Sequence, residues 1–123
     1  MLSARRLSLG LLLYPATAMA DLPAMTCTLT DHCAAGTPCT ETALDFDLEP
    51  GPGGYAASID SDWVSLMQIS PPEAAVKSFV AASPDSVTVL LSLFPDGALA
   101  LTVQEDIDGP HVETAFGRCT GES

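Results

Sequence analysis

The stretch VTVLLSLFPDGALALTV, residues 87–103, decides the fold because it carries a complete β-hairpin in one segment. Two apolar runs of strand length flank Pro95, Asp96 and Gly97. Proline sets the first turn angle, aspartate accepts a hydrogen bond from the nearby backbone, and glycine tolerates the positive φ of a bulged hairpin turn. The stretch therefore predicts two antiparallel strands joined by a tight turn.

The pattern on the N-terminal side of this hairpin also indicates strands. Residues 43–49 alternate strictly, with leucine and phenylalanine on one face and carboxylates on the other. This alternation is typical of an antiparallel strand with one buried face. After a loop predicted at 50–54, Tyr55, Ala57 and Ile59 alternate again, and residues 63–69 form a further candidate strand.

On the C-terminal side, a turn predicted at 106–110 precedes a last strand. Val112, Thr114 and Phe116 alternate there, and the strand is expected to end at Cys119. Together these segments predict an all-β fold, a compact antiparallel barrel or sandwich of about seven to eight short strands.

Residues 70–83 fit two structures. Ser70 and Glu73 have the spacing of a helical capping box around two prolines, and Val76, Phe79 and Val80 suit one helical face. The same segment is short and partly β-branched, which is typical of a strand. We favour a strand here and allow one short helical turn.

The first 20 residues have the plan of a secretory signal peptide. Arg5 and Arg6 precede a short apolar run that ends at Pro15, and Ala18-Met19-Ala20 forms an A-x-A cleavage site. The apolar run is much shorter than the roughly 20 residues that span a bilayer. We expect cleavage after Ala20, a single domain over residues 21–123 without a membrane anchor, and a periplasmic or secreted location.

The charge limits the class of partner. The whole chain carries a formal charge of −12, with 4 basic and 16 acidic residues. Two of the basic residues lie in the predicted signal peptide and all acidic residues follow it, so the mature domain keeps only Lys77 and Arg118 as cations. Such a surface disfavours nucleic acid and anionic lipid, and among proteins it favours a cationic partner. The partner itself is not identified by the sequence.

All four cysteines, Cys27, Cys33, Cys39 and Cys119, lie in the mature chain. An even number in a short exported domain indicates two disulfides, whereas zinc knuckles and thioredoxin-like centres need C-x-x-C spacing that is missing here. Three pairings are possible. We favour Cys33 with Cys39 across a turn containing Gly36 and Pro38, and Cys27 with Cys119 between the first and last strands. His32 is then expected to be exposed and free.

No catalytic, cofactor or metal site is predicted. The mature chain offers His32 and His111 as bases, and neither lies in a recognisable motif. The carboxylate pairs Asp60/Asp62 and Asp106/Asp108 suggest turns, and the second pair lacks the distal glutamate of a calcium loop. Trp63 and Tyr55 are expected to be core residues.

The cysteine framework carries a resemblance. The signal peptide, the C-x5-C-x5-C pattern of Cys27, Cys33 and Cys39, and the closing Phe116-Gly117-x-Cys119 resemble small uncharacterised exported proteins of Gram-negative bacteria. That resemblance implies no known activity. The plan is also similar to that of periplasmic lysozyme inhibitors, which are small disulfide-bonded β-barrels, although no inhibitory loop matches residue by residue.

We therefore expect a non-enzymatic, exported binding or structural module of the bacterial envelope. Two alternatives stay open, a periplasmic lysozyme-type inhibitor and a small-ligand-binding β-barrel. The first would use the acidic surface and the second would need a hollow interior.

Overall fold

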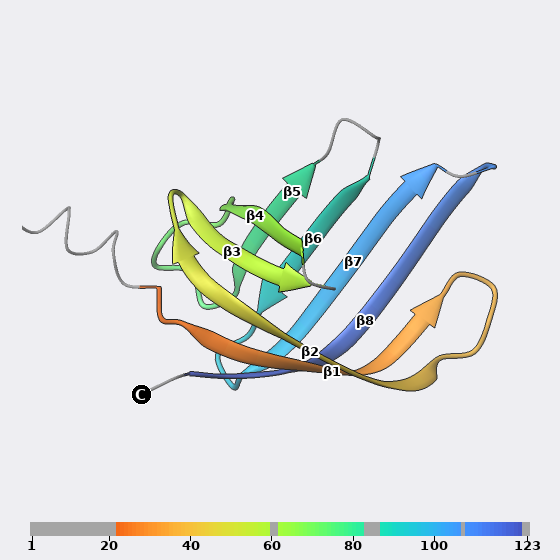
Figure 1. Ribbon diagram of the computed structural model, residues 1–123, viewed down its shortest axis with the longest axis horizontal. Helices are drawn as coiled ribbons and strands as arrows, with labels where there is room; N and C mark the ends of the chain where they lie inside the picture. Colours follow the sequence, from red (N-terminus) through yellow and green to blue (C-terminus); the bar gives the residue numbers. More distant parts are fainter. Residues whose placement is uncertain (1–21, 60–61, 83–86, 107, 122–123) are drawn as a thin grey trace, which may run out of the picture.

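The computed structural model describes residues 22–59, 62–82, 87–106 and 108–121. Within them, eight antiparallel strands follow one another in chain order, and the last returns to the first to close a barrel (Figure 1). The predicted signal peptide lies outside the described residues. No described segment is a helix with the length and apolar character needed to cross a membrane. The strands are β1 (Met25–Ala34), β2 (Thr40–Gly51), β3 (Gly54–Ile59), β4 (Asp62–Gln68), β5 (Lys77–Ala82), β6 (Thr88–Leu93), β7 (Ala98–Asp106) and β8 (Pro110–Gly121).

The predicted hairpin is confirmed as β6 and β7. Asp96 Oδ1 accepts the Ala98 N–H at 2.9 Å, and the Gly97 N–H donates to the Phe94 carbonyl at 2.9 Å. Gly97 has a φ of 94°, the left-handed conformation that the turn requires. The all-β prediction is likewise confirmed, and the barrel alternative holds over the sandwich.

Two local predictions differ from the structure. The loop predicted at 50–54 shrinks to Pro52 and Gly53, because the residues on either side pair as ends of β2 and β3. The helical alternative for 70–83 is wrong within the described residues. Ser70 accepts the Ser78 N–H on its hydroxyl at 3.0 Å instead of capping a helix, and one turn leads into β5.

The inward side chains of the strands fill the barrel. Tyr55 and Phe79 make an edge-to-face ring contact at a centroid distance of 5.1 Å, and the Tyr55 hydroxyl donates to the Pro23 carbonyl at 2.7 Å. Burial raises the pKa of Tyr55 to about 12. Each fully buried leucine or phenylalanine contributes about 1.5–3 kcal/mol. The buried set is Cys27, Leu29, Phe46, Leu48, Tyr55, Ala57, Leu66, Phe79, Leu91, Leu93, Leu99, Leu101, Ala115 and Cys119.

The first and last strands are joined covalently. Cys27 lies directly opposite Cys119 and is bonded to it, which is the predicted pairing. Two residues before Cys119, a Cβ atom on Gly117 would lie 1.9 Å from the Thr28 carbonyl oxygen. Only glycine lets β8 approach β1 this closely.

The second disulfide, Cys33–Cys39, also has the predicted pairing and joins the ends of β1 and β2. Strand β1 extends to Ala34, so Cys33 belongs to the strand and residues 35–39 form the connection. The Ala34 carbonyl accepts the Thr37 N–H at 3.2 Å and the Thr37 hydroxyl at 3.1 Å. The connection is therefore held by both the disulfide and hydrogen bonds.

We predict that the two disulfides differ in their contribution to stability. The Cys27–Cys119 bond spans 92 residues and the Cys33–Cys39 bond spans 6. In the chain-entropy treatment, loops of these sizes give about 4–5 and about 2 kcal/mol. Paired Cys→Ala variants compared by urea unfolding should show this order, after non-reducing peptide mapping has verified the pairing. Equal losses in the two variants would contradict the prediction.

Candidate functional site

A β-bulge in β1 changes which face of the strand points into the barrel. Up to Leu29 the odd-numbered residues face inward, but the register with both β2 and β8 shifts between Leu29 and Asp31. As a result His32 lies opposite the buried Ala115. The extra residue, Thr30, donates its hydroxyl to the Phe116 carbonyl at 3.3 Å. The bulge therefore turns His32 to the inner face near the end of β1.

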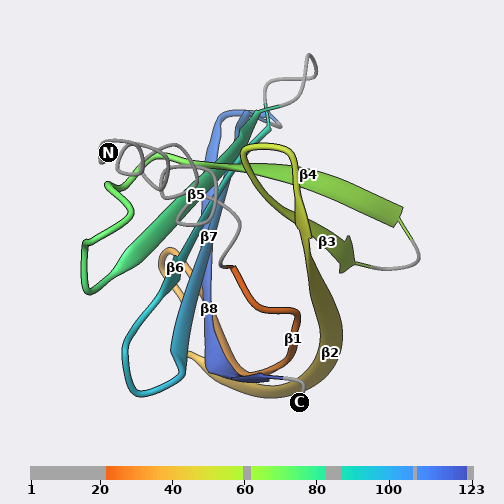
Figure 2. The same cartoon turned by 90° about the vertical axis from the view of Figure 1, so that its left-hand side faces the viewer.

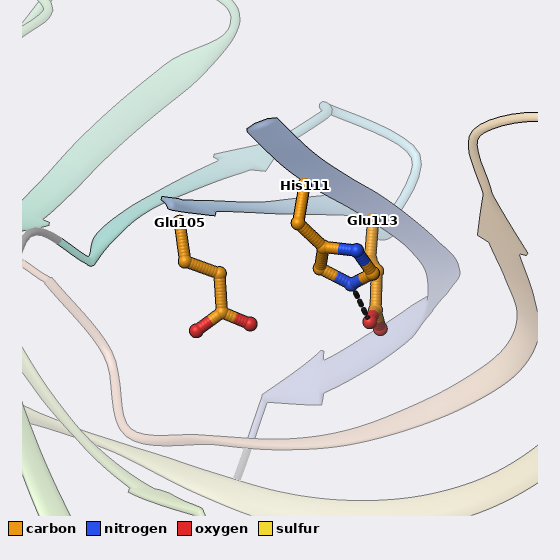
Figure 3. Close-up of side chains that lie close together, drawn as sticks. All are labelled: Glu105, His111 and Glu113. Carbon is orange, nitrogen blue, oxygen red and sulfur yellow. Dashed lines mark hydrogen bonds and ion pairs between the residues drawn. The ribbon is translucent and has the colours of Figure 1, made fainter. Parts of the chain in front are cut away.

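The end of β7 and the start of β8 bring three more polar side chains to the same region. Glu105 pairs directly with His111, and Glu113 follows two residues later on the same face of β8. Figure 3 shows all three projecting from one side of the hairpin. One suitable donor or acceptor atom from each lies within 4.8 Å of the others. We call His32, Glu105, His111 and Glu113 the polar cluster.

The carboxylate of Glu113 is the centre of this cluster. His32 Nε2 donates to Glu113 Oε1 at 2.5 Å, and His111 Nε2 donates to the other oxygen, Oε2. The side chains of His32, His111 and Glu113 are 41%, 40% and 34% exposed, so the cluster is open to solvent. The hydrogen bonds from His111 and then His32 lower the pKa of Glu113, since they stabilise its charged form.

The cluster has the chemistry of a ligand site. Within the described part of the chain, both imidazoles are hydrogen-bonded to Glu113, and neither ring contacts a hydroxyl or thiol. A His–carboxylate pair needs such a nucleophile for covalent catalysis. Imidazole nitrogens and carboxylate oxygens are also metal ligands, and His111, Glu113 and Glu105 are the residues that could hold an ion.

A shallow, open depression adjoins the cluster at the tip of the β7–β8 hairpin. Glu105 and His111 belong to both features. The remaining lining comes from β6, β7 and β8, namely Thr88, Gln104, Asp106, Pro110 and Val112. A ligand held by the cluster would therefore be reachable from outside.

A second unusual feature lies between β4 and β5. These strands pair only through Met67 with Val80 and Gln68 with Phe79, while β4 pairs with β3 along its whole length. Figure 2 shows the start of β4 extending away from β5. Among the described residues, the backbone of β4 before Met67 has no partner on the β5 side. We call this stretch, Asp62–Leu66, the free edge.

Large apolar side chains are exposed on the outer face of β4, with Ser65 between them. Trp63 is 60%, Met67 63% and Ile69, just beyond the strand, 57% exposed. The expectation that Trp63 belongs to the core is therefore wrong, whereas Tyr55 is buried as expected. Trp63 faces outward because it lies opposite Ser58, between the inward positions Ala57 and Ile59.

The other residues singled out in the sequence have varied positions. His32 is not free, because it is bonded to Glu113. Asp62, Asp106 and Asp108 are exposed, and of these Asp106 lines the depression. Asp60 lies outside the described residues.

Sequence reasoning missed Glu105 and Glu113. A signal was present, because counting back in steps of two from Cys119 places Gly117, Ala115, Glu113 and His111 on its face. The alternation of Val112, Thr114 and Phe116 competes with this signal, but Val112 and Phe116 are exposed on the outer face. The bulge that adds His32 has no comparable sequence signal.

We predict that Glu113 contributes to stability in a pH-dependent manner. Its pKa is lowered from 4.5 in the folded protein, so its stabilising effect is present above pH 4.5 and disappears as pH falls through the lowered value. Glu113→Gln should be less stable than wild type at neutral pH, with a gap that closes in acid. Urea unfolding across pH measures this gap.

The matched control is Glu49→Gln, which removes an exposed carboxylate from the outer face of β2. That variant should follow the wild-type acid profile. A gap for Glu113→Gln that stays constant down to the most acidic pH would contradict the role of its ionised form.

The chain matches no family model, no curated protein and no solved structure. Its function must therefore be inferred from its own residues. The polar cluster and the free edge of β4 are the two features with distinctive chemistry.

Proposed function

We propose that the protein is an exported, non-catalytic binding module whose partner adds an extended segment to the free edge of β4. The observation that carries the proposal is that, among the described residues, β4 pairs with β5 through Met67–Val80 and Gln68–Phe79 alone. An unpaired strand edge offers a row of backbone donors and acceptors, and such edges bind peptides by strand addition. The predicted signal peptide and two disulfides support export.

The direction of the backbone groups on the free edge follows from two hydrogen bonds. The Gln68 N–H donates to Gly53, next to β3, whereas the Ile69 N–H donates to Ser78, next to β5. Because successive backbone groups alternate along a strand, Ser65 and Trp63 present their N–H and C=O groups on the β5 side. An added peptide strand would pair with these two residues.

Side chains and charge indicate the kind of peptide. Trp63 and Met67 give an exposed apolar surface beside the free edge, and Asp62 lies at its start. The domain has a strongly negative charge. The partner segment would therefore be extended, with alternating apolar and basic residues, because basic side chains are attracted to this surface.

We predict that an alternating Lys–Val octapeptide binds the mature protein and changes Trp63 fluorescence. Ser65→Pro removes a backbone donor from the free edge, where proline is tolerated, and should weaken binding at least about tenfold. Trp63→Ala should also weaken binding, measured by calorimetry because the fluorophore is lost. Protection of the Ser65 amide from hydrogen exchange on peptide binding would locate the added strand.

The matched control is Phe116→Ala, which removes another exposed aromatic ring, from a strand paired on both sides. It should leave peptide binding unchanged. Equal binding by wild type and Ser65→Pro would show that the free edge is not used.

A second candidate function is inhibition of a cationic lysozyme-type enzyme. It is supported by an acidic row on the outer face of β2, where Asp45, Asp47 and Glu49 are exposed. The Thr28 hydroxyl donates to Asp45 at 2.8 Å and the Thr26 hydroxyl to Asp47 at 3.4 Å. In the described part of the chain, neither ion pair involves these three carboxylates, so they are available to a cationic partner protein.

As an inhibitor, the protein is expected to protect peptidoglycan from lysozyme, and added salt should weaken this protection. Neutralising the acidic row with Asp45→Asn, Asp47→Asn and Glu49→Gln should abolish protection in a turbidity assay. A control with the same change in charge is Asp62→Asn, Glu73→Gln and Asp108→Asn, three exposed carboxylates elsewhere. Lysis at the same rate with and without the wild-type protein would exclude this candidate.

The small-ligand barrel receives less support. Its inward side chains pack as one buried cluster that includes Phe79, Leu48 and Leu66. A barrel of eight strands has room either for such side chains or for one small ligand. The buried cluster favours the first arrangement.

A further inference from the structure

We propose that His111, Glu113 and Glu105 form a binding site for a divalent transition-metal ion of the zinc type. Each residue offers one ligand atom, and the three atoms lie within 4.8 Å of one another. The set combines an imidazole nitrogen with two carboxylate oxygens, which zinc binds at about 2.0–2.2 Å. This site is separate from the free edge and goes beyond the binding of a peptide partner.

The framework around the site is fixed, while the side chains can adjust. Glu105 and His111 are directly opposite each other on paired strands, so their backbones are held by the sheet. Ligands around a tetrahedral zinc ion lie about 3.3 Å apart, given the bond lengths above. His111 and Glu113, which are hydrogen-bonded to each other, would therefore have to separate for an ion to enter. Their partial exposure leaves room for these changes of rotamer.

The charges fit a divalent cation. Two carboxylates bring two negative charges to one small region, which an ion of charge +2 balances. The chain as a whole is strongly acidic, and its field concentrates cations near the surface. Without a metal, Glu113 has two imidazole partners, but no hydrogen bond or ion pair to Glu105 is recorded in the described part of the chain.

The ligand types distinguish this site from a calcium site. Calcium takes six to eight oxygen ligands, whereas an imidazole nitrogen favours zinc, nickel or copper. Thiolate ligands are not available in the described chain, since all four cysteines are in disulfides. Three protein ligands would leave the fourth position of a tetrahedral ion for water or another ligand.

His32 has a different role as a positioning residue. It donates to Glu113 Oε1, which leaves Oε2 on the side of His111. Groups that hold a metal ligand in this way raise metal affinity by about 10–100-fold. Because His32 reaches this position through the β1 bulge, the N-terminal strand also takes part in forming the site.

Isothermal titration of metal-free mature protein with zinc chloride tests the proposal. We expect one zinc ion per chain, with release of protons where a ligand is protonated, and a rise in the unfolding temperature. His111→Ala and Glu105→Gln should each reduce zinc affinity by more than about 100-fold. This exceeds the loss expected for a residue that only holds a ligand in place. Glu49→Gln is the control for loss of one carboxylate outside the site, and it should bind like wild type.

His32 is tested with two variants. His32→Ala should lower zinc affinity by about 10–100-fold, and His32→Gln, which keeps a donor at the end of the side chain, should restore most of it. Circular dichroism without metal verifies that each variant is folded. If His111→Ala is unfolded, Glu105→Gln alone decides.

Three results would overturn the site. The first is no zinc binding by wild type at millimolar metal. The second is equal zinc affinity of wild type and Glu105→Gln, and the third is calcium binding as tight as zinc binding. Either of the last two results would mean that the metal binds to scattered surface carboxylates and not at the proposed site. Peptide binding at the free edge would be unaffected by any of them, because it depends on β4.

Discussion

The closure of the barrel between β1 and β8 is the constraint on which the rest of the structure depends. An eight-stranded meander in chain order has its first and last strands as free edges unless they pair with each other. Here Gly117 allows the close approach, and the buried Cys27–Cys119 bond makes it permanent. The same pairing determines which residues of β8 face inward, and thereby places His111 and Glu113 on the inner face.

Local patterns predict much of this fold. The turn at Pro95-Asp96-Gly97 and the alternation of Leu44, Phe46 and Leu48 are confirmed because each depends on chemistry within a few neighbouring residues. The disulfide pairing was also predictable, since a short turn favours Cys33 with Cys39 and the remaining cysteines then pair. Where a local pattern allowed two structures, as at Ser70, a contact with Ser78 on another segment decided between them.

The candidate sites depend on relations that local patterns do not contain. Glu105 and His111 become neighbours only because the β7–β8 register places them opposite each other. His32 joins Glu113 only because one extra residue at Thr30 reverses the faces of β1. The free edge of β4 similarly results from a lack of pairing with β5 beyond two residues, and Trp63 looks like a core residue until that geometry is known.

Two strand pairs on opposite sides of the barrel, β8 with β1 and β4 with β5, differ in how firmly they are joined. The pairing of β8 with β1 extends along nearly the whole of β1, apart from the bulge, and is covalently linked. Among the described residues, the pairing of β4 with β5, halfway around the barrel, consists of two residue pairs. The molecule is thus built as two four-stranded halves with a strong hinge line and a weak one. Because local opening is easiest where few contacts cross, we expect β4 to separate from β5 before β1 separates from β8. Solvent would then reach the core through that opening while the disulfide-linked half of the barrel wall stays intact.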